Sequence, residues 1–182
     1  MNKFFVCIFV FVAVFTCLSS ASAGQFKYPD EINYDDMSYK LAYKKELPNG
    51  RAIYEYTAKS EKVEHWTTLI TLNYSKQSIS TPEHWLDAMR LQLKRDQTLA
   101  ELNKFNEIDG HGYVGFVFEP TSQYPEFEVN ASKSFHNEKC GGILTLQYAK
   151  KYAKDAALEL VNQNLEKFLA TLNQMNWLPA CE

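Results

Sequence analysis

The stretch from Glu61 to Arg95 most constrains the fold, because a strand pattern and a helix pattern follow each other there with only a short polar segment between them. From Trp66 to Tyr74 the residues alternate with the period of two that is typical of a β-strand. Ser80 and the segment Thr81-Pro82-Glu83 then provide a capping box and a first-turn proline. Apolar residues recur at helical spacing after it, at Leu86, Met89 and Leu93. The stretch therefore predicts a helix that packs on a sheet.

The first 23 residues have the composition of a secretory signal peptide. Lys3 precedes an apolar run from Phe4 to Leu18, and small residues that end in Ala-Ser-Ala follow, so we predict cleavage after Ala23. The run is shorter than the roughly 20 apolar residues that span a membrane, although an uncleaved anchor is an alternative. Cys17 allows lipoprotein processing as a third option. We expect a secreted or periplasmic protein with no transmembrane segment after cleavage.

The predicted mature chain is one domain with a mildly acidic balance. Removal of 23 residues leaves 159 of the 182, enough for one domain with a substantial core. Lys3 is the only charge lost, so 18 basic residues remain against 22 acidic ones. This balance disfavours nucleic acid and anionic membranes, which are bound through excess Lys and Arg. The expected plan is a signal peptide over 1–23, a loop or arm over 24–39, and a single α+β domain over 40–182.

Two cysteines, Cys140 and Cys181, remain after cleavage. In an exported protein such a pair predicts a disulfide. The bond would connect the start of the last strand with the C-terminus and close a loop worth about 4 kcal/mol in the chain-entropy model. The alternative is a free Cys140 that a nearby histidine activates.

The rest of the chain predicts strands and a second helix. Hairpins are expected at 41–47 with 51–58, around Pro48-Asn49-Gly50, and at 104–108 with 113–118. Alternation continues over 127–136, where Lys133 interrupts the apolar side and indicates a position near a sheet edge, and over 143–149. Apolar residues at steps of three and four predict a helix from Leu158 to Met175, with Asp155 as its cap. The fold class is therefore α+β, a predominantly antiparallel sheet of about six to seven strands packed with two amphipathic helices.

The strand Trp66-Thr67-Thr68-Leu69-Ile70-Thr71, the helix start Thr81-Pro82-Glu83 and the terminal amphipathic helix resemble small exported α+β proteins of the Mog1/PsbP-like group, including the bacterial DcrB type. The similarity covers most of residues 40–178 as a pattern of elements. It implies a binding or assembly factor more than an enzyme, and it transfers no site residues.

Early tyrosines and one Glu-His-Trp triplet supply a candidate binding surface. Tyrosine offers a large contact area with a polar tip, although it is also a favoured strand residue. Glu-His-Trp occurs twice, but strand and cap placement separate His65 from His84. The candidate binding surface consists of Tyr43, Tyr54, Tyr56, His65 and Trp66.

The leading hypothesis is an exported, non-enzymatic binding or assembly factor of the cell envelope, whose partner is a protein or a small molecule. No catalytic residue, metal or cofactor is predicted, because the common hydrolase, zinc and phosphate-loop motifs do not occur. The competing hypothesis is a metal-dependent or hydrolytic exported enzyme that uses His111, His136 and Cys140. The sequence identifies neither the ligand nor the oligomeric state.

Overall fold

The computed structural model describes residues 26–48, 50–58, 61–76, 81–96, 98–137, 140–177 and 179–181. The predicted signal peptide over 1–23, its cleavage point and the alternatives that involve it lie outside these residues. Asn49 of the first predicted turn and Ser80 of the predicted capping box also lie outside them.

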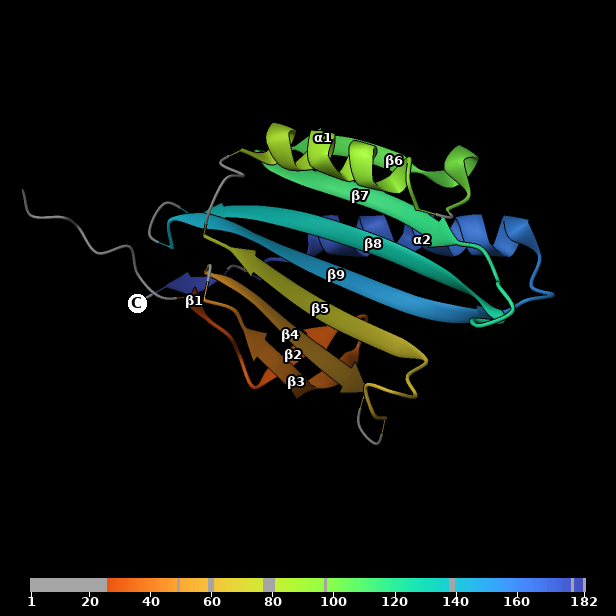
Figure 1. Ribbon diagram of the computed structural model, residues 1–182, viewed down its shortest axis with the longest axis horizontal. Helices are drawn as coiled ribbons and strands as arrows, with labels where there is room; N and C mark the ends of the chain where they lie inside the picture. Colours follow the sequence, from red (N-terminus) through yellow and green to blue (C-terminus); the bar gives the residue numbers. More distant parts are fainter. Residues whose placement is uncertain are drawn as a thin grey trace, which may run out of the picture.

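An antiparallel sheet of eight strands forms the body of the protein (Figure 1). Its strand order is β2 (Glu31–Tyr34), β3 (Met37–Glu46), β4 (Arg51–Ala58), β5 (Thr68–Ser75), β9 (Gly142–Ala153), β8 (Glu126–Asn137), β7 (His111–Phe118) and β6 (Lys104–Ile108). A second sheet pairs β1 (Phe26–Lys27) with β10 (Ala180–Cys181). The helices are α1 (Pro82–Leu93), α2 (Leu158–Gln174) and the short 3-10 helix η1 (Ala100–Leu102). The predicted α+β class is confirmed, with more strands than the expected six to seven.

The additional strands lie mostly in the segment 24–39, which we expected to be a loop or arm. Its described part, from Phe26 onward, forms β1, β2 and the start of β3 instead. Asp35 and Asp36 have φ angles of 48° and 61° and make the tight turn between β2 and β3. Strands of two and four residues are too short to show a period, and β1 pairs with residues at the other end of the chain.

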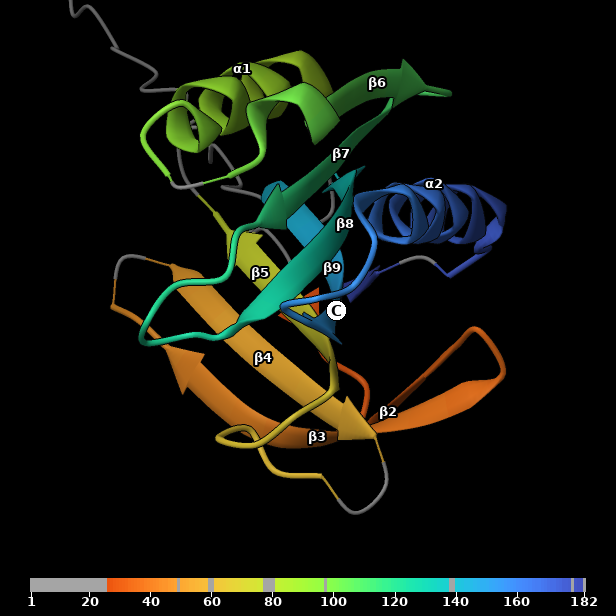
Figure 2. The ribbon, with the colours of Figure 1, turned by 90° about the vertical axis from the view of Figure 1, so that its right-hand side faces the viewer.

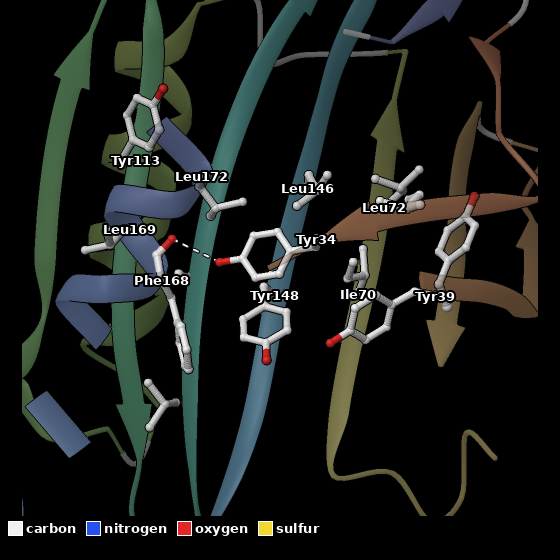
Figure 3. Packing of buried hydrophobic residues seen from close by; sticks show 14 of the residues in the cluster. Tyr34, Tyr39, Ile70, Leu72, Tyr113, Leu146, Tyr148, Phe168, Leu169 and Leu172 are labelled. Carbon is white, nitrogen blue, oxygen red and sulfur yellow. Dashed lines mark hydrogen bonds between the residues drawn. The ribbon is translucent and has the colours of Figure 1, made fainter. Parts of the chain in front are cut away.

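The two long helices lie on opposite faces of the sheet (Figure 2). On one face, α2 buries Val161, Leu165, Phe168, Leu169 and Leu172 in the main core. The hairpin of β2 and β3 closes this core from the side: Tyr34 donates a hydrogen bond to the backbone oxygen of Phe168 at 3.1 Å and stacks on Tyr148 (Figure 3). This face is therefore filled by side chains.

The opposite face is covered by α1 over only part of its width. Thr81 caps this helix, since its side chain accepts a hydrogen bond from the backbone nitrogen of His84 at 3.2 Å. Trp85, Leu86 and Leu93 are buried in a second, smaller core with residues of β7 and β9. The helix lies over β6, β7 and β8, so β4 and β5 present their side chains on this face beside it rather than beneath it (Figure 2).

Two local expectations are corrected. Lys133 does not mark an edge, because β8 lies between β9 and β7, and its side chain is only 5% exposed. Its Nζ donates to the backbone oxygens of Leu172 and Met175 at the C-terminal end of α2, each at 3.4 Å. The α2 helix starts after Ala157 without a side-chain cap, so Asp155 does not cap it.

The predicted disulfide between Cys140 and Cys181 is present. It connects the segment before β9 with β10, and 41 positions separate the two residues in the sequence. Tyr74 donates a hydrogen bond to the backbone oxygen of Cys140 at 2.6 Å, which joins this clamp to β5. The alternative of a free Cys140 is therefore wrong.

Candidate functional site

A groove runs between α1 and the uncovered part of the sheet, and we call it the sheet–helix groove. Its first arm encloses about 650 Å³ and is lined by α1 on one side and by β4, β5, β9 and β8 below. Its second arm encloses about 870 Å³ beyond the end of α1. Asp96 and Phe118 line both arms, so the two arms meet at these residues.

The floor of the first arm is polar because alternate residues of three neighbouring strands face it. In the register of β5, β9 and β8, Asn73 lies opposite Thr145, and Gln147 lies opposite Ser132. The other residues of these strands face α2 and form the main core, as Leu72 and Leu146 do. The period of two along each strand thus places apolar side chains on one face and amides and hydroxyls on the other.

Part of this floor is fixed by hydrogen bonds between side chains. Gln147 Nε2 donates to Asn130 Oδ1 at 2.8 Å, and Ser132 Oγ donates to Gln147 Oε1 at 3.4 Å. Asn130 Nδ2 also donates to the backbone oxygen of Glu128 at 3.1 Å. Asn130 and Ser132 are buried, so these bonds hold their polar groups in one orientation.

Two floor residues have hydrogen-bonding groups that remain available. Asn73 is half-buried and Thr145 is 9% exposed, and both line the first arm. Within the described part of the chain neither side chain makes a hydrogen bond. The Thr145 hydroxyl is also in contact with solvent, because it has no partner and is not one of the fully buried polar atoms. These adjacent groups can each donate and accept a hydrogen bond to a ligand.

The wall of the first arm is apolar and comes from α1. Trp85, Ala88 and Met89 face the groove from this helix. The helix approaches the sheet closely because β7 carries a glycine under it: a Cβ built at Gly112 would lie 2.8 Å from Cε3 of Trp85. The glycine therefore sets the height of the wall above the floor.

The second arm carries aromatic and charged side chains. Lys151 Nζ lies 4.3 Å from the centroid of the Trp66 ring and 3.8 Å from Glu126 Oε2. Burial raises the pKa of the neighbouring Glu128 carboxyl, an effect that the Asn130 amide and the positive charge of Lys151 oppose. This end of the groove is acidic, because its lining carries five carboxylates against Arg95 and Lys151; the carboxylates are those of Glu64, Asp96, Glu119, Glu126 and Glu128.

The structure does not bring the five residues of the candidate binding surface together. Tyr54 and Tyr56 are 3% and 0% exposed and face the main core. Their hydroxyls donate to Glu46 Oε1 and to the backbone oxygen of Pro29. Tyr43 is exposed on the face of the sheet that points away from the main core, and His65 is exposed. Of the five residues, only Trp66 lines the groove.

The residues of the competing enzyme hypothesis do not form a centre either. His111 Nδ1 lies 2.9 Å from the backbone oxygen of Ser134, and its ring packs against Phe135. His136 is exposed, and Cys140 is consumed by the disulfide. Among the residues that the structure describes, no group of three His, Cys, Asp or Glu side chains could hold a metal ion.

Sequence reasoning missed the floor of the groove. The alternation over 127–136 predicts a strand, but it does not show what the polar side of that strand faces. The signal that could have found the floor is the coincidence of small polar residues on three strands, at Thr71 and Asn73, at Thr145 and Gln147, and at Asn130 and Ser132. That coincidence becomes visible only when the order β5-β9-β8 is known.

The sheet, its two helices and the groove define an α+β protein with one filled face and one partly open face. The chain belongs to an uncharacterised protein family, whose model matches residues 26–177. It is 24% identical over 202 aligned residues to a Haemophilus influenzae protein described as an uncharacterized protein, and the alignment covers 100% of both chains. No solved structure matches the chain. Among the described helices, none is long and apolar enough to cross a membrane.

Proposed function

We propose that the mature chain, beginning at Gly24, is exported to the periplasm or the cell exterior and acts there as a non-enzymatic binding or assembly protein. The sheet–helix groove carries this proposal, because it combines an ordered polar floor, available hydrogen-bonding groups and an apolar wall. Ligand sites have this composition, in which a few fixed polar groups orient a ligand against apolar surface.

The chemistry of the floor favours binding over catalysis. Amides and hydroxyls such as those of Asn73, Thr145 and Gln147 recognise ligands by hydrogen bonding and keep one protonation state around neutral pH. General acid–base catalysis depends instead on a titratable group beside the reacting atom. The resemblance to the Mog1/PsbP-like group, which contains binding and assembly factors, supports the same function.

Export is supported by the signal-peptide pattern of the first 23 residues and by the Cys140–Cys181 disulfide. Disulfides persist in oxidising compartments and are rare in the cytosol. Mass spectrometry of the full chain after expression in a Gram-negative bacterium tests this. We expect the protein in the periplasm or medium with Gly24 at its N-terminus, whereas a cytosolic protein that keeps residues 1–23 would contradict export.

A second experiment tests the groove. The mature protein is sedimented with the washed envelope fraction of the source cells, and the bound fraction is compared among three forms. Ala88→Trp places a large side chain at the wall of the first arm, and Leu91→Trp is the matched control, because Leu91 is 57% exposed on the same helix and does not line the groove. We expect Ala88→Trp to lose binding and Leu91→Trp to keep it. Equal binding by both variants, or no binding by the wild type, would refute the proposal.

A further inference from the structure

The form of the sheet–helix groove indicates a linear ligand. Ile143, Thr145 and Gln147 of β9 line the first arm and Lys151 of the same strand lines the second, so the two arms together extend along β9. The eight residue steps from Ile143 to Lys151 correspond to a length of about 25 Å. Two arms of this combined length, which meet at Phe118, fit several consecutive units of a chain better than a single small molecule.

The position of the groove excludes the usual way in which a sheet binds a peptide. An extended peptide adds to a sheet edge through backbone hydrogen bonds. The floor lies instead over β5, β9 and β8, which are interior strands whose neighbours pair with them on both sides. Recognition at the floor must therefore use side chains, and the available ones are the amide of Asn73 and the hydroxyl of Thr145.

These two groups match the hydroxyls of a sugar. The Asn73 amide carries donors and an acceptor, and the Thr145 hydroxyl does both, as does each hydroxyl of a sugar. Gln147 beside them is already held by Asn130 and Ser132, so the floor is ordered before a ligand arrives. A ligand that leaves Asn73 and Thr145 without partners would desolvate them at a cost, which gives the floor selectivity for hydroxyl-rich ligands.

The walls match the apolar faces of sugar rings. Phe118 is half-buried where the two arms meet, and Trp66 is half-buried in the second arm. Aromatic rings provide flat apolar surface against which the C–H face of a pyranose can pack. Among the described residues that line the first arm, the charged ones are Arg51 at one end and Asp96 at the other, so its centre is uncharged.

We propose that the ligand of the sheet–helix groove is an uncharged, unbranched oligosaccharide that lies along β9, with its hydroxyls bound by Asn73 and Thr145 and its rings packed against Phe118 and Trp66. This inference rests on the proposed function and names the ligand class of the same site.

Titration of the mature, disulfide-bonded protein in ¹H–¹⁵N NMR spectra tests the inference. The probes are cellohexaose, maltohexaose and hexa-N-acetylchitohexaose, with glucose and an uncharged hexapeptide of Ser and Gly for comparison. We expect saturable binding of at least one hexasaccharide, with shifts of the side-chain amide signals of Asn73 and Gln147 and of the indole signal of Trp66. Glucose and the peptide should produce no saturable shifts.

Variants connect the binding to the floor. Asn73→Ala and Thr145→Val each remove one available group, and each should weaken the hexasaccharide about tenfold. Asn33→Ala is the control, because Asn33 is an exposed strand residue in β2, outside the groove. Ala88→Trp blocks the same groove without changing the floor and should abolish binding. This variant therefore tests the groove even if a floor variant fails to fold.

Three outcomes would overturn the inference: no saturable binding of any hexasaccharide, saturable binding of the peptide alone, or hexasaccharide binding that survives the floor variants and Ala88→Trp. If envelope binding depends on the groove while all hexasaccharides fail, the ligand class is wrong and the proposed function stands. If groove-dependent envelope binding also fails, the proposed function falls with it.

Discussion

Lys133 shows how a single residue can be misread from its pattern and still have a structural role. Its ammonium group is enclosed between α2 and the rings of Tyr113 and Phe135, whose centroids lie 5.5 and 5.2 Å away. Burial lowers the pKa of this ammonium group. The free-energy cost of burying this charge is offset by the hydrogen bonds to the last carbonyls of α2, where the helix dipole also favours a positive charge.

We expect Lys133→Ala to lower the free energy of unfolding by about 2–4 kcal/mol, because it leaves a cavity and removes the partner of two carbonyls. Lys133→Met keeps most of the volume and should cost less. Urea denaturation measures both, and Lys40→Ala on an exposed position of β3 should change stability by at most about 0.5 kcal/mol. Equal effects of Lys133→Ala and Lys40→Ala would show that the buried ammonium does not stabilise α2.

Among the secondary-structure elements, β7 determines how closely both helices approach the sheet. Gly112 and Gly115 are three positions apart, so they lie on opposite faces of this strand. A Cβ at Gly112 would lie 2.8 Å from Trp85 of α1, and a Cβ at Gly115 would lie 2.9 Å from Leu165 and from Leu169 of α2. One strand thus positions the wall of the groove and the cover of the main core.

Gly112→Ala and Gly115→Ala should each reduce the free energy of unfolding by about 1–3 kcal/mol through overpacking. The two variants should differ in where they act. Gly112→Ala displaces α1 and should change the fluorescence of Trp85, whereas Gly115→Ala should increase hydrogen exchange in α2. Gly110→Asn is the control, because Gly110 has φ +73°, which Asn tolerates, and a Cβ there meets nothing within 4 Å. If the control is as destabilising as the two alanine variants, close helix packing is not the cause.

The elements that sequence reasoning recovered are those whose periodicity is local. The pattern from Leu158 to Met175 predicted α2 to within one residue at its end, and Thr81 and Pro82 predicted the start of α1. The short strands β1 and β10 could not be recovered, since their pairing depends on residues at opposite ends of the chain. The groove was missed for a related reason, because the polar residues of its floor come from three strands and lie side by side only in the strand order of the folded sheet.

At the scale of the whole molecule, the two faces of the sheet are stabilised differently, and the main core is rich in tyrosine. Burial raises the pKa of seven tyrosine hydroxyls in the described part of the chain: Tyr34, Tyr54, Tyr56, Tyr74, Tyr113, Tyr148 and Tyr152. For Tyr152 the pKa rises to about 12. The neutral forms of these side chains are therefore part of the folded state.

This distribution predicts a steep loss of stability in alkali. An unfolded tyrosine ionises near pH 10, whereas each buried one stays neutral in the folded protein at higher pH. The stabilisation is therefore complete below about pH 10 and is lost as the pH rises above it, because the unfolded state then binds fewer protons. Lys133 acts in the opposite direction, since its lowered pKa makes folding more favourable as the pH rises towards its unfolded value of 10.5. One lysine acts against seven tyrosines, so we expect the tyrosines to dominate and the free energy of unfolding to fall as the pH rises.

Guanidinium denaturation at pH 8 and at pH 11 should show a lower free energy of unfolding at pH 11, and absorbance at 295 nm should show buried tyrosines ionising together with unfolding. Tyr34→Phe should flatten this pH dependence while costing about 1 kcal/mol at pH 8 for the lost hydrogen bond to Phe168. A folded protein whose tyrosines all ionise gradually near pH 10 would show that the main core is open to water. Such a result would also remove the contrast between a sealed α2 face and an accessible groove on the α1 face, on which both functional proposals depend.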